Sequence, residues 1–217
     1  MEEWLVPEHM KQLAGTTVKN FGYDKTNVIQ YHFNEYGFRN KYNSGPSINV
    51  IGNSVSFGIG VDQSFGDVLS QKINLPCNNF SFGCYFHENH DHLTNLKKLI
   101  DRDCDDIFII QINNLDRLRD GDTVVSGLDK ITARDRFLDY FEQIDIMFNK
   151  RKLLLVYWDD QDFDLPQSIV KKIAIHNKCH LDCSLDNKNT FGVRSHNIIA
   201  KTLASLINIA QFYNGRT

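Results

Sequence analysis

The stretch Ser47–Val61, which reads SINVIGNSVSFGIGV, decides the fold that the sequence predicts. Its first residues, Ser47–Ile51, are an apolar-rich run of strand length, and a glycine-rich turn follows them. A helix-like stretch from about Ser64 to Ile73 comes next. A strand that passes through a turn into a helix is the repeating unit of α/β proteins with a parallel sheet.

The rest of the chain repeats this alternation. The run Asp106–Ile112 is apolar on both faces, as expected of a strand buried inside a parallel sheet, and Leu153–Trp158 has the same character. Further strands are expected at Asn78–Ser81 and near Cys179–Cys183. Helices are expected at His90–Ile100, over residues 132–150, from Pro166 through Ile169, Ile173 and Ala174, and from about Val193 to Ile209. Five strands that each lead into a helix predict a parallel sheet covered on both faces.

The N-terminal part of the chain has a different character. Residues 1–46 are polar and aromatic with weak periodicity, and they end in the turn cluster Asn43–Pro46. We therefore expect an N-terminal extension, residues 1–46, packed on an α/β domain formed by residues 47–217. Because ligands of open parallel sheets bind beyond the carboxyl ends of the strands, the loops after the first, second, third and fifth strands should share one functional rim.

Composition excludes several classes of protein. The net charge of −3, with acids and bases interleaved, lacks the basic patch of a nucleic-acid binder. The longest apolar runs are far too short to span a membrane. The first residues lack the basic and apolar regions of a secretory signal, and the odd number of cysteines, 5, does not suggest a disulfide framework. We therefore expect a cytoplasmic protein; the sequence does not indicate its oligomeric state.

Ser54 is the first residue of chemical interest. A serine at a tight strand-to-helix turn presents its hydroxyl to the crevice, and its own N–H can donate to a developing oxyanion. The other interpretation of Gly52-Asn53-Ser54 is an ordinary loop with a helix N-cap.

Two segments then carry a resemblance to a known family. The loop Gly52–Val61 resembles the first conserved block of the SGNH (GDSL-type) hydrolases, with Asn53 in place of the usual Asp. Upstream, Asn34–Arg39 resembles the Asn-x-x-Gly-Phe-Arg segment that precedes this block in one branch of the class. The resemblance implies a three-layer α/β/α sandwich around a five-stranded parallel sheet, in the flavodoxin-like strand order 2-1-3-4-5. It also implies that Ser54 is a nucleophile.

The next two blocks would supply the oxyanion hole. Residues 79–84 resemble the second block, whose glycine, here Gly83, donates a backbone N–H. In the third block Asn114 is the best match for the amide donor, with Asn113 second, although the usual Gly is missing. The resemblance therefore implies an oxyanion hole made by Ser54, Gly83 and Asn114. Ordinary turns at the ends of these strands would explain both segments equally well.

The fourth block departs from the family pattern. Alignment on Ser195-His196 places Thr190 at the position of the catalytic His and Asn187 at that of the Asp. A serine hydroxyl needs an adjacent base, which contributes roughly 10²- to 10⁴-fold in rate. The nearest candidate base is His196, oriented by Asp186, whereas a surface histidine on the first helical turn is the alternative. Three further histidines follow the second strand on the same rim: His87, His90 and His92.

Two clusters suggest other chemistry only weakly. Residues 176–183 are rich in His, Cys and Asp, but their spacing matches no usual zinc pattern, so no metal is expected. The acidic run 159–164 is typical of a solvated loop, with cation binding or a lid as alternatives.

The sequence thus supports competing functions. The first is a serine esterase or acylhydrolase without a cofactor, acting on a small acyl ester, such as an O-acetylated carbohydrate, through an acyl-serine intermediate. The second is a catalytically degenerate module of the same class that binds carbohydrate or serves a structural role. A nucleotide or flavin binder fits less well, because the loop has neither a Walker-type Lys nor a dinucleotide fingerprint.

Overall fold

The fold is known from a computed structural model of the chain. It describes residues 4–19, 28–82, 89–101, 106–111, 119–120, 123–124, 139, 142–144, 146–147, 152–156, 173–175 and 192–214. All structural statements below refer to these residues.

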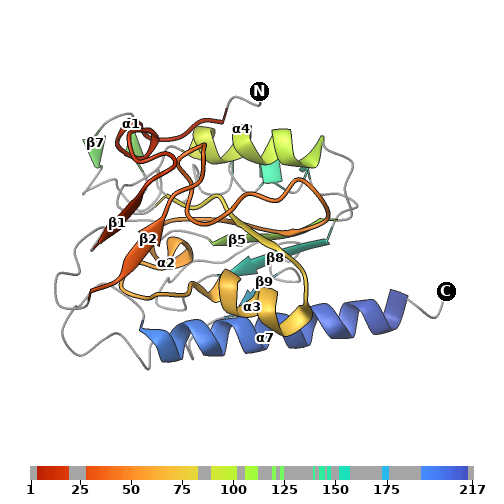
Figure 1. Ribbon diagram of the computed structural model, residues 1–217. Helices are drawn as coiled ribbons and strands as arrows, with labels where there is room; N and C mark the ends of the chain where they lie inside the picture. Colours follow the sequence, from red (N-terminus) through yellow and green to blue (C-terminus); the bar gives the residue numbers. More distant parts are fainter. Residues whose placement is uncertain are drawn as a thin grey trace.

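A parallel sheet forms the middle of the molecule (Figure 1). Its strand order is β4-β3-β5-β8-β9, and every neighbouring pair is parallel. The strands are β3 (Ile48–Ile51), β4 (Cys77–Asn79), β5 (Ile107–Gln111), β8 (Lys152–Val156) and β9 (Ile173–Ile175). The pairing is regular from β4 to β8 and shifts in register between Leu155 and Val156, where β9 joins.

The predicted fold class is wrong as a description of this molecule. Besides the parallel sheet, the chain forms two antiparallel two-stranded sheets, which the prediction of one five-stranded α/β/α sandwich does not contain. One pairs β1 (Thr17–Lys19) with β2 (Gln30–His32), and the other pairs β6 (Arg119–Asp120) with β7 (Thr123–Val124). These strands are only two or three residues long, so alternation of polar and apolar residues gives almost no signal for them.

The last parallel strand also corrects the prediction. Ile173–Ile175 is β9, whereas the sequence predicts a helix through Ile173 and Ala174. The strand expected near residues 179–183 lies outside the described residues. A short apolar run such as Ile-Ala-Ile fits a helix face and a buried strand equally well, so hydrophobic spacing does not separate them.

The helices pack on both faces of the parallel sheet (Figure 1). They are α1 (Glu8–Lys11), α2 (Ser54–Phe57), α3 (Phe65–Ile73), α4 (Asn89–Ile100) and α7 (Val193–Asn214). Within the predicted helix 132–150, the described residues 139, 142–144 and 146–147 are helical. Figure 1 shows α4 on one side of the strands and α3 with α7 on the other.

Strand β5 explains why two cores form. Successive side chains of a strand point to opposite faces, and all of β5 is buried. Phe108 and Ile110 join the core under α4, while Ile107 and Ile109 join the core under α3 and α7.

The N-terminal segment belongs to the core on the α4 side. Trp4, Met10, Tyr31 and Phe38 are buried in the same cluster as Phe80 of the sheet region. The rings of Trp4 and Phe80 lie 4.9 Å apart between centroids. The antiparallel pair β1–β2 therefore lies against the parallel sheet and forms part of its packing.

Candidate functional site

The predicted nucleophile lies where β3 passes into α2. Ser54 is the first residue of α2, and Asn53 caps that helix by accepting a hydrogen bond from Val55 N–H at 3.2 Å. The turn is too tight for any residue but glycine at position 52. A Cβ on Gly52 would lie 2.5 Å from Ser56 Oγ and 2.6 Å from Gln111 Cβ.

Gln111, the last residue of β5, binds this turn through hydrogen bonds of its side-chain amide. Its Oε1 accepts hydrogen bonds from Ser56 N–H at 2.9 Å and from the Ser56 hydroxyl at 2.6 Å. Its Nε2 donates to Asn53 Oδ1 at 2.6 Å, and Asn53 N–H lies 3.4 Å from its Oε1. No role is predicted for Gln111 from the sequence, although a Gln inside the apolar run Ile107–Ile112 is the signal that could reveal one.

Asn79 holds the same turn from β4 on the other side of β3. Its Nδ2 donates to the Ser56 carbonyl at 2.9 Å, and its side chain is buried. Beyond the strand, Phe82 N–H donates to the Gly52 carbonyl at 3.1 Å. The Ser54 turn is therefore bound by side chains from both strands that flank β3.

Arg39 holds the loop that follows α2. Its Nη1 donates to the carbonyls of Phe57 and Gly58 at 2.7 and 2.6 Å, and its Nη2 donates to those of Val61 and Asp62 at 2.8 and 2.6 Å. The guanidinium carbon also lies 4.8 Å from the centre of the Tyr31 ring. Burial lowers the pKa of the Arg39 guanidinium, and negative charge at Asp67 opposes that shift.

The side chain of Arg39 thus joins the segment Asn34–Arg39 to the segment Gly52–Val61. Arg39 ends the first segment, and its guanidinium donates to three backbone carbonyls of the second segment and to that of Asp62, which follows it directly. Asn34 shapes the first segment because its Oδ1 accepts hydrogen bonds from Tyr36 N–H and Phe38 N–H. Gly58 has φ +82° and lies against Arg39, so a side chain there would be strained and would clash.

Ser54 itself differs from its neighbours. Its side chain is partly exposed, and within the described residues neither its N–H nor its hydroxyl has a hydrogen-bond partner. By contrast, Ser56 is fully buried and bound to Gln111 through both its N–H and its hydroxyl. The turn therefore leaves one serine with its donor groups available for a ligand.

His196 lies in the first turn of α7 and is buried, with 1% of its surface exposed. Its Nδ1 accepts a hydrogen bond from Phe65 N–H at 2.9 Å, at the first residue of α3. The neutral ring therefore carries its proton on Nε2. The ring also stacks on that of Phe65. No hydrogen bond joins His196 to Ser54 in the part of the chain that the structure describes.

The other predicted site residues are not placed. Gly83, Asn113, Asn114, Asp186 and Thr190 lie outside the described residues. So do His87, the acidic run 159–164 and the cluster 176–183. His90 and His92 lie on α4, with side chains outside the description. Among the described residues, no three His, Cys, Asp or Glu side chains come close enough to hold a metal ion.

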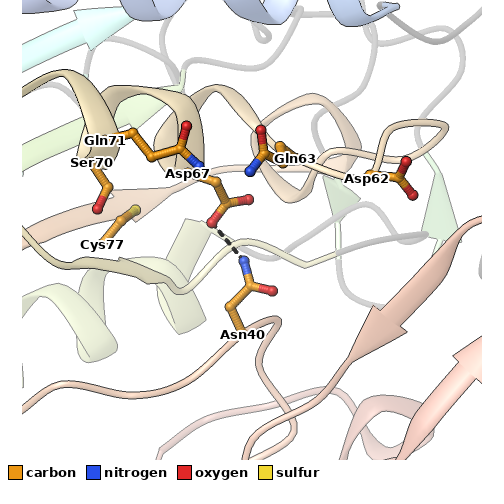
Figure 2. A pocket seen from close by; sticks show the side chains of 7 residues that line it. All are labelled: Asn40, Asp62, Gln63, Asp67, Ser70, Gln71 and Cys77. Carbon is orange, nitrogen blue, oxygen red and sulfur yellow. Dashed lines mark hydrogen bonds between the residues drawn. The ribbon is translucent and has the colours of Figure 1, made fainter.

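A polar hollow of about 310 Å³ lies at a different place, beside α3 and the start of β4 (Figure 2). Asn40 and Asp67 line it and contact each other directly, with Asn40 Nδ2 donating to Asp67 Oδ1 at 2.6 Å. Burial raises the pKa of the Cys77 thiol, and the nearby negative charge of Asp67 raises it further. The thiol is therefore protonated and a poor nucleophile at neutral pH. None of the predicted site residues lines this hollow.

Comparison with known proteins finds no matching family model and no significant match among curated proteins. Within the described residues, no helix combines the length and apolar character needed to cross a membrane.

Proposed function

We propose that this chain is a serine ester hydrolase of the SGNH (GDSL) type, with Ser54 as its nucleophile. The observation that carries the proposal is the state of Ser54. It is partly exposed after the carboxyl end of β3, and its N–H and hydroxyl have no partner among the described residues. The groups around it, from Asn53 to Phe57, are held by hydrogen bonds.

This geometry suits acyl transfer. The Ser54 oxygen would attack the carbonyl carbon of a small acyl ester, and a base would take the hydroxyl proton. The Ser54 N–H would donate to the resulting oxyanion, together with Gly83 N–H and the Asn114 amide. Collapse would break the ester C–O bond, release the alcohol with a proton, and leave an acyl-serine that water hydrolyses. The substrate, an O-acetylated carbohydrate or another small ester, and a cytoplasmic location belong to this proposal.

A fluorophosphonate probe tests the proposal, because it reacts with activated serines. We expect the probe to label Ser54 in the wild-type protein, and Ser54→Ala to abolish labelling. Because Ser54 makes no side-chain hydrogen bond among the described residues, this variant should keep the wild-type melting temperature.

Ser205→Ala is the matched control, since Ser205 is an exposed serine on α7. Its labelling should equal that of wild type. Folded wild-type protein that takes up no probe at Ser54 would contradict the hydrolase and favour the second candidate.

The second candidate is a module of the same class that binds a carbohydrate or small ester without turnover. The observation that favours it is the hydrogen bond that His196 accepts from the backbone of α3. The Phe65 N–H occupies its Nδ1, and Nε2 carries the proton of the neutral ring, so His196 in this arrangement has no lone pair for the serine proton. The role of His196 as the base, oriented by Asp186, stays a prediction, and substitution of His196 tests it.

A further inference from the structure

The side-chain amide of Gln111 lies between β5 and the Ser54 turn. Gln111 is 2% exposed and is the last residue of a strand that is otherwise apolar. A buried amide needs hydrogen-bond partners for both its oxygen and its nitrogen. Here both atoms find them in one place, on Asn53 and Ser56.

These contacts fix the orientation of the amide. The Oε1 atom accepts from two donors of Ser56, its N–H at 2.9 Å and its hydroxyl at 2.6 Å, so it must face α2. The Nε2 atom donates to Asn53 Oδ1 at 2.6 Å, and that same oxygen accepts from Val55 N–H. One side chain therefore forms hydrogen bonds to the turn on both sides of Ser54.

The contacts of Gln111 leave out Ser54 itself. The amide binds residues 53 and 56, and through Asn53 it reaches Val55, but it makes no contact with the Ser54 hydroxyl or N–H. The turn is thus held while its one partly exposed serine keeps both groups available. Such an arrangement orients a nucleophile without consuming its hydrogen-bonding capacity.

We propose that Gln111 is the positioning residue of Ser54: its amide sets the backbone of the Asn53–Ser56 turn and so directs the Ser54 hydroxyl and N–H. The inference rests on the proposed function for its consequence in reactivity. Its structural part, that the Gln111 amide fixes the conformation of the turn, is measured separately.

Two variants test it. Gln111→Leu replaces the amide with an apolar side chain of similar size and removes all of its hydrogen bonds to the turn. We expect the rate of fluorophosphonate labelling at Ser54 to fall at least ~10-fold after correction for the folded fraction, because small misplacements of reacting groups have large effects. Asn53→Asp keeps an acceptor for both Gln111 Nε2 and Val55 N–H, so its labelling rate should stay within about 3-fold of wild type.

Backbone hydrogen exchange measures how firmly Gln111 fixes the turn, and it does not depend on the reactivity of Ser54. The Ser56 N–H donates to Gln111, so its exchange rate should rise at least ~10-fold in Gln111→Leu and little in Asn53→Asp. Leu203→Ala is the control for lost stability, because it destabilises the core under α7 and removes none of the hydrogen bonds that hold the turn. Its labelling rate per folded molecule should match wild type.

The outcomes separate the two proposals. If Ser56 exchange in Gln111→Leu equals that of wild type, or if exchange rises while labelling stays unchanged, Gln111 is not the positioning residue. If wild-type Ser54 takes up no probe, the hydrolase proposal fails. The exchange rate of Ser56 then still decides whether Gln111 sets the turn.

Discussion

At the scale of single residues, Arg39 holds the loop after α2 in place through its side-chain hydrogen bonds. Its four hydrogen bonds end on carbonyl oxygens of one short loop, and its side chain is 1% exposed. A planar guanidinium offers several donors in a fixed fork, whereas the ammonium of lysine is a compact point charge. Arg39 is therefore specified by geometry as well as by charge.

Replacing Arg39 should destabilise the whole fold. Arg39→Met leaves four carbonyl oxygens without their donor, and we expect the free energy of unfolding to fall by about 3 kcal/mol or more. Arg39→Lys should be intermediate, because one ammonium cannot reach all four oxygens. Urea unfolding followed by circular dichroism measures both. Arg194→Met, at an exposed arginine of α7, is the control and should unfold like wild type.

The residues of the candidate site were predictable to different degrees. The position of Ser54 at a strand-to-helix turn follows from the pattern of an apolar run, a glycine and a helix, and the structure places it there. The roles of Gln111 and Arg39 were not predictable in the same way. The polar Gln in the apolar run Ile107–Ile112 marks Gln111 as unusual, but residue type does not show which groups, distant in sequence, Gln111 and Arg39 bind.

At the scale of elements, His196 connects two helices. Its Nδ1 accepts from the first N–H of α3, which otherwise has no intrahelical partner, and its ring lies at the first turn of α7. Ser64 and Asp67 add a capping box at the same helix start. The beginning of α3 is therefore fixed by its own cap and by a residue 131 positions away.

Substitution of His196 separates this structural role from the predicted role as a base. His196→Ala leaves the buried Phe65 N–H without an acceptor and should lower the free energy of unfolding by about 1–3 kcal/mol. His196→Asn supplies an amide oxygen close to the place of Nδ1, so most of that stability should return. Thermal melts of the two variants measure the difference.

Probe labelling of the same two variants tests the chemistry. If His196 is the base, both variants should lose labelling or turnover by at least ~100-fold per folded molecule. Unchanged labelling in His196→Asn would remove His196, and with it Asp186, from the mechanism. Equal stability of the alanine and asparagine variants would contradict the capping role.

Element prediction was most accurate where hydrophobic patterns were long, and it was wrong at the three-residue strand β9. The run Ile107–Gln111 is apolar on both faces, and α3 begins with a capping signal that is readable in the sequence. Ile173–Ile175 is three residues long, and Ile173 follows Ile169 by four residues, a spacing that suits a helix. The segment is a strand because it pairs with β8 in the folded protein, and its own sequence does not indicate that pairing.

At the scale of the whole molecule, the N-terminal segment and the parallel sheet share one core. Asn95 on α4 binds Leu5 reciprocally: its Oδ1 accepts from Leu5 N–H at 2.9 Å, and its Nδ2 donates to the Leu5 carbonyl at 2.8 Å. Trp4 packs its ring against Phe38 and Phe80. The predicted boundary at residue 46 separates two stretches of sequence that bury each other's side chains in this way.

If this shared core folds as one unit, a change at Trp4 should destabilise the entire chain. Trp4 is 4% exposed, so Trp4→Ala should lower the free energy of unfolding by about 3–5 kcal/mol, through lost burial and the cavity left behind. Val28→Ala, at a side chain that is 74% exposed in the same region, should change little. Hydrogen exchange in β3 and β5 should accelerate together with exchange in β2 in Trp4→Ala. Faster exchange confined to β2 would instead make the N-terminal segment a separate, dispensable layer.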